Sequence, residues 1–73
     1  MAFWSKFAPR HWILTEDDGI VARAVRRSGR WVWEVQSDQG ADVVGLAETL
    51  AAAMLAVGRV RRQVRAQAAG KAA

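Results

Sequence analysis

The chain has 73 residues, enough for one small domain, and its 52% hydrophobic and 25% charged residues exclude a disordered protein. It contains no cysteine, which excludes disulfide bonds and thiolate metal sites, so packing has to stabilise the fold, and four tryptophans supply much of the apolar area. The formal net charge of +4 comes almost entirely from nine arginines and indicates an anionic partner, either a nucleic acid or an acidic protein surface.

The first nine residues, "MAFWSKFAP", form an aromatic arm. Phe3, Trp4 and Phe7 lie at helical spacing, and Pro9 separates them from the body of the chain because the residue before a proline is driven out of helical geometry. Three roles are open for this arm: a part of the protein's own core, a segment that inserts into a partner, or a membrane-surface anchor.

Residues 10–44 are predicted to form an antiparallel sheet. Aromatic and β-branched runs at residues 10–15, 20–26 and 30–36 are separated by glycine-containing turns, which is the pattern of a meander. A fourth short strand at residues 42–44 is an alternative that the pattern leaves open.

The second hairpin can be given a register. If Ser28 and Gly29 form a two-residue turn, small alanines lie beside large side chains on one face and opposite charges meet on the other. The pairs set by this turn are Arg27 with Arg30, Ala24 with Trp33, Ala22 with Val35, and Arg23 with Glu34. The face predicted to be buried consists of Ile20, Ala22, Ala24, Trp31, Trp33 and Val35.

The first hairpin turns at "EDDG", residues 16–19. A three-residue loop with Gly19 in the left-handed conformation would place Trp12 and Leu14 in the core, whereas a loop of two or four residues would bury Ile13 instead. We favour the three-residue loop.

Residues 45–69 change to the period of a helix, and residues 70–73 are expected to fray. Gly45 is the predicted N-cap, with Glu48 in the first turn, where a carboxylate is favoured by the helix dipole. One face of this helix is apolar and is predicted to pack on the sheet: Leu46, Leu50, Ala53, Met54, Val57, Val60 and Val64.

The predicted fold is therefore a single α+β domain, an antiparallel meander of three or four strands with one long C-terminal helix on its tryptophan-rich face. A helix of about 24 residues is about 36 Å long, whereas a seven-residue strand is about 23 Å long, so the last helical turns should overhang the sheet. We expect the aromatic arm to fold back, in a form that could include one helical turn, against Val60 and Val64 or against one edge of the sheet.

The residue types give little support for catalysis, and no enzymatic activity, metal ion or cofactor is expected. His11 has no cysteine to activate and is interpreted as a packed or surface residue. Glu16, Asp17 and Asp18 form a turn and lack the further ligands of a calcium loop.

A membrane location is not expected either. No segment has the pattern of a signal peptide. The longest apolar window, residues 46–57, contains Glu48 and is shorter than the ~20 residues of a membrane span. The sequence predicts a cytoplasmic protein, of a bacterium or a phage-infected cell.

The arginines are the main candidates for binding. One group flanks the "RSG" turn, where the opposed Arg27 and Arg30 would repel each other unless an anion lies between them. Another group lies in the last turns of the helix, where the helix dipole and solubility also favour cations. Together with the aromatic arm, the candidate partner-binding residues are Arg26, Arg27, Arg30, Arg59, Arg61, Arg62, Arg65, Phe3, Trp4 and Phe7.

The order of a short arm, three strands and a C-terminal helix is similar to the layout of the double-stranded-RNA-binding domain, and "APRH" resembles that family's Gly-Pro-x-His stretch. In that family the helix opens with lysines that contact phosphates, whereas this helix opens with "GLAETLAAAM". The resemblance is therefore limited to topology, and membership is not inferred.

The expected function is non-enzymatic binding of a protein with an acidic surface, because aromatic residues and arginine are enriched in protein interfaces and lysine is depleted. By size alone, small bacterial or phage accessory and inhibitor proteins, including anti-CRISPR proteins, offer an analogy. Nucleic-acid binding through the arginines is the first alternative, and a structural component of a virion or larger assembly is the second.

Overall fold

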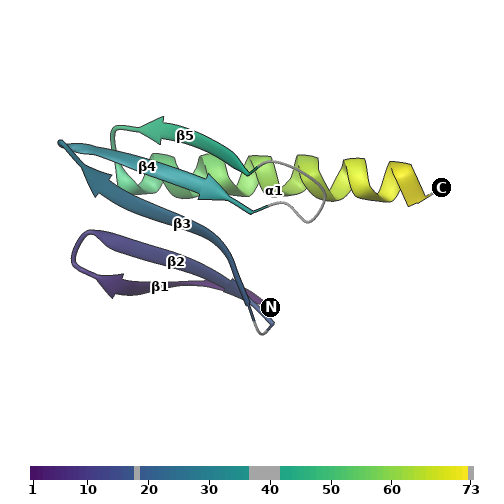
Figure 1. Cartoon of the computed structure of the whole chain (residues 1–73), viewed down its shortest axis with the longest axis horizontal. Coiled ribbons are helices and arrows are strands. Elements are labelled where there is room, and N and C mark those ends of the chain that lie inside the picture. Colours follow the sequence, from purple (N-terminus) through teal and green to yellow (C-terminus); the bar gives the residue numbers. More distant parts are fainter. Residues whose placement is uncertain (18, 37–41, 73) are drawn as a thin grey trace.

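A computed structural model describes residues 1–17, 19–36 and 42–72, with side chains up to residue 64. It consists of one antiparallel sheet followed by one helix, which confirms the expected α+β class (Figure 1). The sheet has five strands, so the prediction of three or four is wrong. The strands follow one another across the sheet in chain order, as a meander. The elements are β1 (Ala2–Ala8), β2 (His11–Glu16), β3 (Gly19–Arg27), β4 (Arg30–Val35), β5 (Val43–Ala47) and α1 (Leu50–Ala72).

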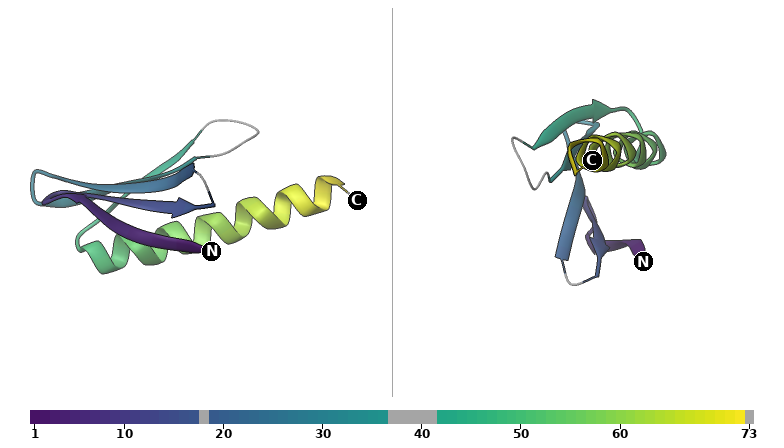
Figure 2. Two further views of the ribbon diagram at one scale, coloured as in Figure 1. Left: turned by 90° about the horizontal axis from the view of Figure 1, so that it is seen from below. Right: turned by 90° about the vertical axis from the view of Figure 1, so that its right-hand side faces the viewer.

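The helix covers one face of one half of the sheet. It packs on β3, β4 and β5, while β1 and β2 lie to one side of it (Figures 1 and 2). Its C-terminal half runs past the ends of the strands, as the lengths predict (Figure 1). No described element covers the opposite face of the sheet, which we call the uncovered face.

The β3–β4 hairpin has the predicted register. Ser28 and Gly29 form its turn with φ of 52° and 76°, the left-handed values that a tight two-residue hairpin turn requires. The observed pairs include Arg27 with Arg30, Ala24 with Trp33, Ala22 with Val35, and Arg23 with Glu34.

The β2–β3 hairpin differs from the prediction. Glu16 pairs with Gly19, so the loop has two residues, and Asp17 (φ 55°) is left-handed whereas Gly19 is not. The faces are nevertheless as expected, because Val21 has no partner residue in β2 and forms a bulge that shifts the register by one.

The bulge decides which side chains enter the core. Leu14 is buried opposite Ala22 and Trp12 is half-buried opposite Ala24, as expected. Ile20, however, is exposed, and Val21 packs against the core in its place. The prediction that Ile20 belongs to the buried face is therefore wrong.

The helix begins five residues later than predicted. Thr49 is its cap, because the Thr49 hydroxyl accepts a hydrogen bond from the Ala52 amide at 3.0 Å. Gly45 is consequently no cap but lies in β5, where it pairs with Trp33. The apolar spacing of residues 43–47 suits a strand as well as a helix, and the open edge of β4 supplies the hydrogen-bond partners that decide between them.

Leu46 is the clearest error among the predicted core residues. It lies on β5 opposite Val32, on the uncovered face, and is 63% exposed. The buried core consists of Leu14, Ala22, Ala24, Trp33, Val35, Ala53 and Val57. Of the other predicted core residues, those that are only half-buried are Trp12, Trp31, Leu50 and Met54.

The aromatic arm is an edge strand and contains no helical turn. As β1 it pairs with β2, which satisfies the backbone groups on its inner side and places it at the edge of the sheet, away from the overhanging helix. Trp4 pairs with Leu14 and packs against the core, whereas Phe3 faces the other way. Of the expected positions, the edge of the sheet is the observed one, and Val60 and Val64 are not covered by the arm.

Gly45 makes room for Trp33. A Cβ atom at position 45 would overlap the benzene ring of the Trp33 indole. On the other side of Trp33, the neighbouring residue in β3 is Ala24, which is fully buried. The indole thus lies between two strands that carry small residues next to it.

We predict that Gly45→Ala lowers the free energy of unfolding by about 1–3 kcal/mol, because the added methyl group forces the indole to move. The measurement is urea unfolding followed by circular dichroism. Gly19→Ala is the matched strand control and should be nearly neutral, since nothing lies within 4 Å of its Cβ position. Gly58→Ala, in the helix with equal room, should stabilise the protein by about 0.5–1 kcal/mol. Equal stabilities for all three variants would contradict the tight contact.

Candidate functional site

Strand alternation assigns a defined set of side chains to the uncovered face. Residues that pair across adjacent strands point to the same side of a sheet, and those paired with the buried alanines and Trp33 belong to the helix-covered side. The alternate residues therefore belong to the uncovered face: Phe3, Ser5, His11, Ile13, Arg23, Val25, Arg27, Arg30, Val32, Glu34, Val44 and Leu46.

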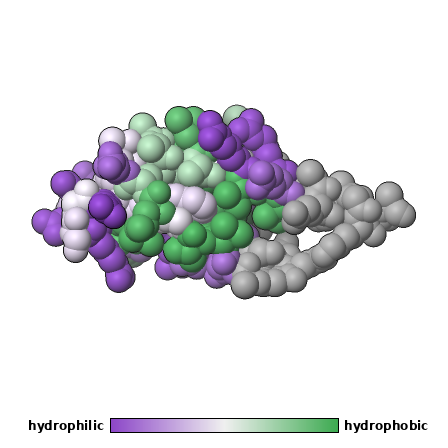
Figure 3. Space-filling view, turned by 90° about the horizontal axis from the view of Figure 1, so that it is seen from above, coloured by the Kyte–Doolittle hydropathy of each residue, from purple (hydrophilic) through white to green (hydrophobic). Residues whose placement is uncertain are grey.

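The margins of the uncovered face are apolar and exposed. Val44 and Leu46 of β5 are 59% and 63% exposed, and Phe3 of β1 is 58% exposed at the opposite edge. Seen from the β5 side, hydrophobic side chains gather over β5 and the N-terminal half of α1, with hydrophilic side chains flanking them (Figure 3). Since β5 is also an edge strand, its outer backbone groups are open to a further strand.

The centre of the uncovered face is a basic pocket of about 290 Å³. Val25 lies between Arg23 and Arg27 on β3, and each arginine is two residues, or about 7 Å along the strand, from Val25. His11 and Val32 are the residues paired with Val25 on either side. Glu34 completes the lining.

Two polar atoms in this pocket are buried and have no hydrogen-bond partner among the described residues: Nε2 of His11 and Nε of Arg23. Glu34 lies next to Arg23 in register, as predicted, but the described residues show no ion pair between them. The expected salt bridge is thus absent, and the charges of Arg23 and Glu34 do not neutralise each other.

Phe7 holds the imidazole of His11 on one side. A bulge between Lys6 and Ala8 leaves Phe7 without a partner residue in β2, and its ring meets the His11 ring edge-on, with centroids 5.1 Å apart and an interplanar angle of 64°. The Phe7 side chain itself is 70% exposed. The exposed Phe7 ring therefore lies beside His11, one of the residues that line the pocket.

The arginines at the β3–β4 turn lie at one end of the uncovered face. Arg27 and Arg30 face each other as predicted, and both are exposed, as is Arg26. Arg26 pairs with Trp31 and therefore belongs to the helix-covered side. The structure thus divides this turn cluster between the two faces.

The helical arginines do not form one surface either. Arg59 and Arg62 are exposed, whereas Arg61 forms an ion pair with Glu16 at the end of β2. The structure does not describe the Arg65 side chain. The helical group predicted from the sequence is therefore split, and Arg61 has an internal role.

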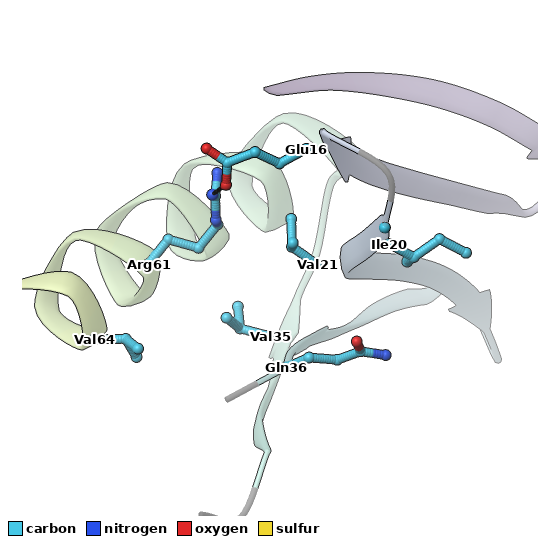
Figure 4. Close-up of a pocket in the computed structure, with 8 residues that line it drawn as sticks. Glu16, Ile20, Val21, Val35, Gln36, Arg61 and Val64 are labelled. Atoms are coloured by element: carbon cyan, nitrogen blue, oxygen red, sulfur yellow. Dashed lines mark hydrogen bonds and ion pairs between the residues drawn. The ribbon is translucent and has the colours of Figure 1, made fainter. Parts of the chain in front are cut away.

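The Arg61–Glu16 pair lies at the wall of a second pocket, of about 340 Å³, between the overhanging helix and the sheet (Figure 4). Val21, Val35 and Val64 supply its apolar lining. With side chains only 17% and 25% exposed, Arg61 and Glu16 are shielded from water, which strengthens their attraction. The pair fastens the middle of α1 to the β2–β3 end of the sheet.

We predict that Arg61→Met lowers the free energy of unfolding by about 1–2 kcal/mol, more than an exposed pair contributes because this pair is largely shielded. Urea unfolding of the purified variant measures the loss. The matched control is Arg62→Met, the exposed neighbour, which should change stability by less than about 0.5 kcal/mol. Equal losses for both variants would show that the ion pair does not fasten the helix.

Sequence reasoning missed the residues at the centre and one margin of this face. The sequence pattern predicts a salt bridge for Arg23, a packed or surface position for His11 and a core position for Leu46. The strict alternation of Arg23, Val25 and Arg27 along β3 is the signal that places them together.

No family model matches the chain, and no curated protein or solved structure is significantly similar to it. The described residues contain no group of three or more histidine, aspartate or glutamate side chains placed to hold a metal ion. In the same part of the chain, no helix has the length and apolar character needed to cross a membrane.

Proposed function

We propose that the protein is a non-enzymatic binding module that acts through protein–protein contacts, and that it binds its partner with the uncovered face. The observation that carries this proposal is the composition of that face, in which exposed apolar and aromatic side chains border a centre of arginines. Interfaces between proteins are enriched in aromatic residues and arginine.

The charges on the uncovered face indicate which kind of partner is complementary to it. Among the paired residues of β3 and β4 that the structure describes, Arg23, Arg27 and Arg30 belong to the uncovered face, together with one carboxylate, Glu34. A surface that carries acidic groups between apolar ones is complementary to this arrangement, and the chain's net charge of +4 favours the encounter. A small accessory or inhibitor protein of a bacterium or phage is the setting that we propose.

A nucleic acid is the second candidate, favoured by the exposed arginines at the turn and on the helix, Arg26, Arg27, Arg30, Arg59 and Arg62. These arginines lie on both sides of the sheet, and Glu34 and the exposed valine and leucine of β5 interrupt the basic surface. A phosphate backbone needs a continuous basic track, so we rank this candidate below a protein.

The test is photo-crosslinking in the source cell. A photo-reactive amino acid in place of Leu46 should yield an adduct with a protein that survives nuclease treatment. The matched control replaces Leu55, a leucine of the helix that is equally exposed and faces away from the core. Protein adducts of equal yield at both positions, or at neither, would contradict binding through the uncovered face.

A salt titration separates the two classes of partner. With generic duplex and single-stranded oligonucleotides near physiological salt, we expect dissociation constants no tighter than about 1 µM, within or above the non-specific range. Fluorescence anisotropy measures them. Tighter binding, with an affinity that falls steeply as salt is added, would favour the nucleic-acid candidate over the protein.

A further inference from the structure

The two unpaired polar atoms in the basic pocket require an explanation. Nε of Arg23 and Nε2 of His11 are buried, and the described residues offer them no hydrogen-bond partner. Leaving such a group unpaired costs about 1–3 kcal/mol, and native proteins contain few of them. A pair of them in one pocket, next to a second arginine, is the arrangement expected where a ligand completes the hydrogen bonds.

The pocket also has the geometry of a site for a small anion. Val25 and Val32 give it an apolar floor, which lowers the local dielectric and strengthens charge–charge attraction above it. Arg23 and Arg27 come two residues before and after Val25 on β3 and line the same pocket, so both side chains are within reach of an anion bound above Val25. The His11 imidazole, held edge-on by Phe7, closes the side toward β1.

We infer that Arg23, Arg27 and His11 form a carboxylate-binding site, and that its ligand is an aspartate or glutamate side chain of the protein partner. This inference rests on the proposed function and names the chemistry at the centre of the interface. The carboxylate oxygens accept hydrogen bonds from both guanidinium groups and from His11 in the tautomer that carries hydrogen on Nε2.

Glu34 distinguishes a carboxylate from a phosphate. It lines the same pocket, so two arginines are opposed by one carboxylate. A singly charged ligand suits that balance, whereas the second negative charge of a phosphate monoester or of inorganic phosphate would be repelled by Glu34. The exposed Val44 and Leu46, on the same face as Glu34, favour a protein around the anionic group as well.

The experiment is an NMR titration of the full, ¹⁵N-labelled chain. The probe is a capped peptide of alternating glutamate and serine, and the matched peptide has glutamine in place of glutamate. We expect the glutamate peptide to shift the Arg23 Nε–H and His11 ring signals, and the glutamine peptide to leave them in place. Arg23→Gln should weaken binding about tenfold, the loss expected for one charge-assisted hydrogen bond.

The control variant loses one arginine charge, as Arg23→Gln does, but outside the pocket. Arg59→Gln removes the same charge from the exposed face of the helix and should leave the affinity within about twofold. Arg27→Gln, an exposed position that should not disturb folding, replaces Arg23→Gln if the latter fails to fold by circular dichroism. Equal losses from the pocket and helix variants would overturn the site, because they would show diffuse attraction only.

Inorganic phosphate is the competing probe. If it shifts the same signals at lower concentration than the glutamate peptide, the assignment of the ligand as a carboxylate is wrong. Glu34→Gln should raise the affinity for phosphate more than that for the peptide. Should the site fail while the Leu46 crosslink persists in the Arg23→Gln chain, the proposed function stands and only the inferred site is lost.

Discussion

The packing of one indole determines how this molecule is built. Among the described residues Trp33 has the largest buried side chain, and its indole has room on β4 because the residues beside it on β3 and β5, Ala24 and Gly45, are small. Because these residues are small, α1 can approach β3–β5 closely, and its Ala53 and Val57 join the same buried core cluster as Trp33. The helix is thereby committed to one side of the sheet and leaves the uncovered face without a covering element among the described residues.

The sequence predicted the β3–β4 hairpin residue by residue because everything that fixes it is local. Ser28 and Gly29 suit a primed turn, and size and charge complementarity agree on a single register. The β2–β3 hairpin has no such redundancy. A loop shorter by one residue and a bulge at Val21 give the same faces for Trp12 and Leu14 as the loop that was expected, so pattern analysis reaches the right faces by a wrong route.

The arm and the start of the helix depend on contacts between distant parts of the chain. Three aromatic residues at helical spacing describe a strand equally well, and the open edge of β2 decides for β1. In the same way, the apolar spacing of residues 43–47 fits a strand or a helix, and pairing with β4 makes this segment a strand. The candidate site was the part least predictable from the sequence. Arg23 and His11 line one pocket only after β2, β3 and β4 have paired in register. The arginines of the turn, which are close in sequence, were found.

The bulge at Val21 sets the sidedness of the whole N-terminal third of the chain. Everything before it, both β1 and β2, is related to β3 through this one unpaired position. A slip of the pairing by one residue, with Val21 retained and the bulge lost, would exchange the two sides of these strands. Trp4 and Trp12 would then move to the uncovered face and Phe3 would leave it. Loss of the Val21 codon has no such effect, because Leu14 stays opposite Ala22 and Thr15 stays opposite Ile20, now in an unbroken ladder. The extra residue of β3 can therefore be removed in one in-frame step without turning the aromatic side chains of β1 and β2 from one face to the other.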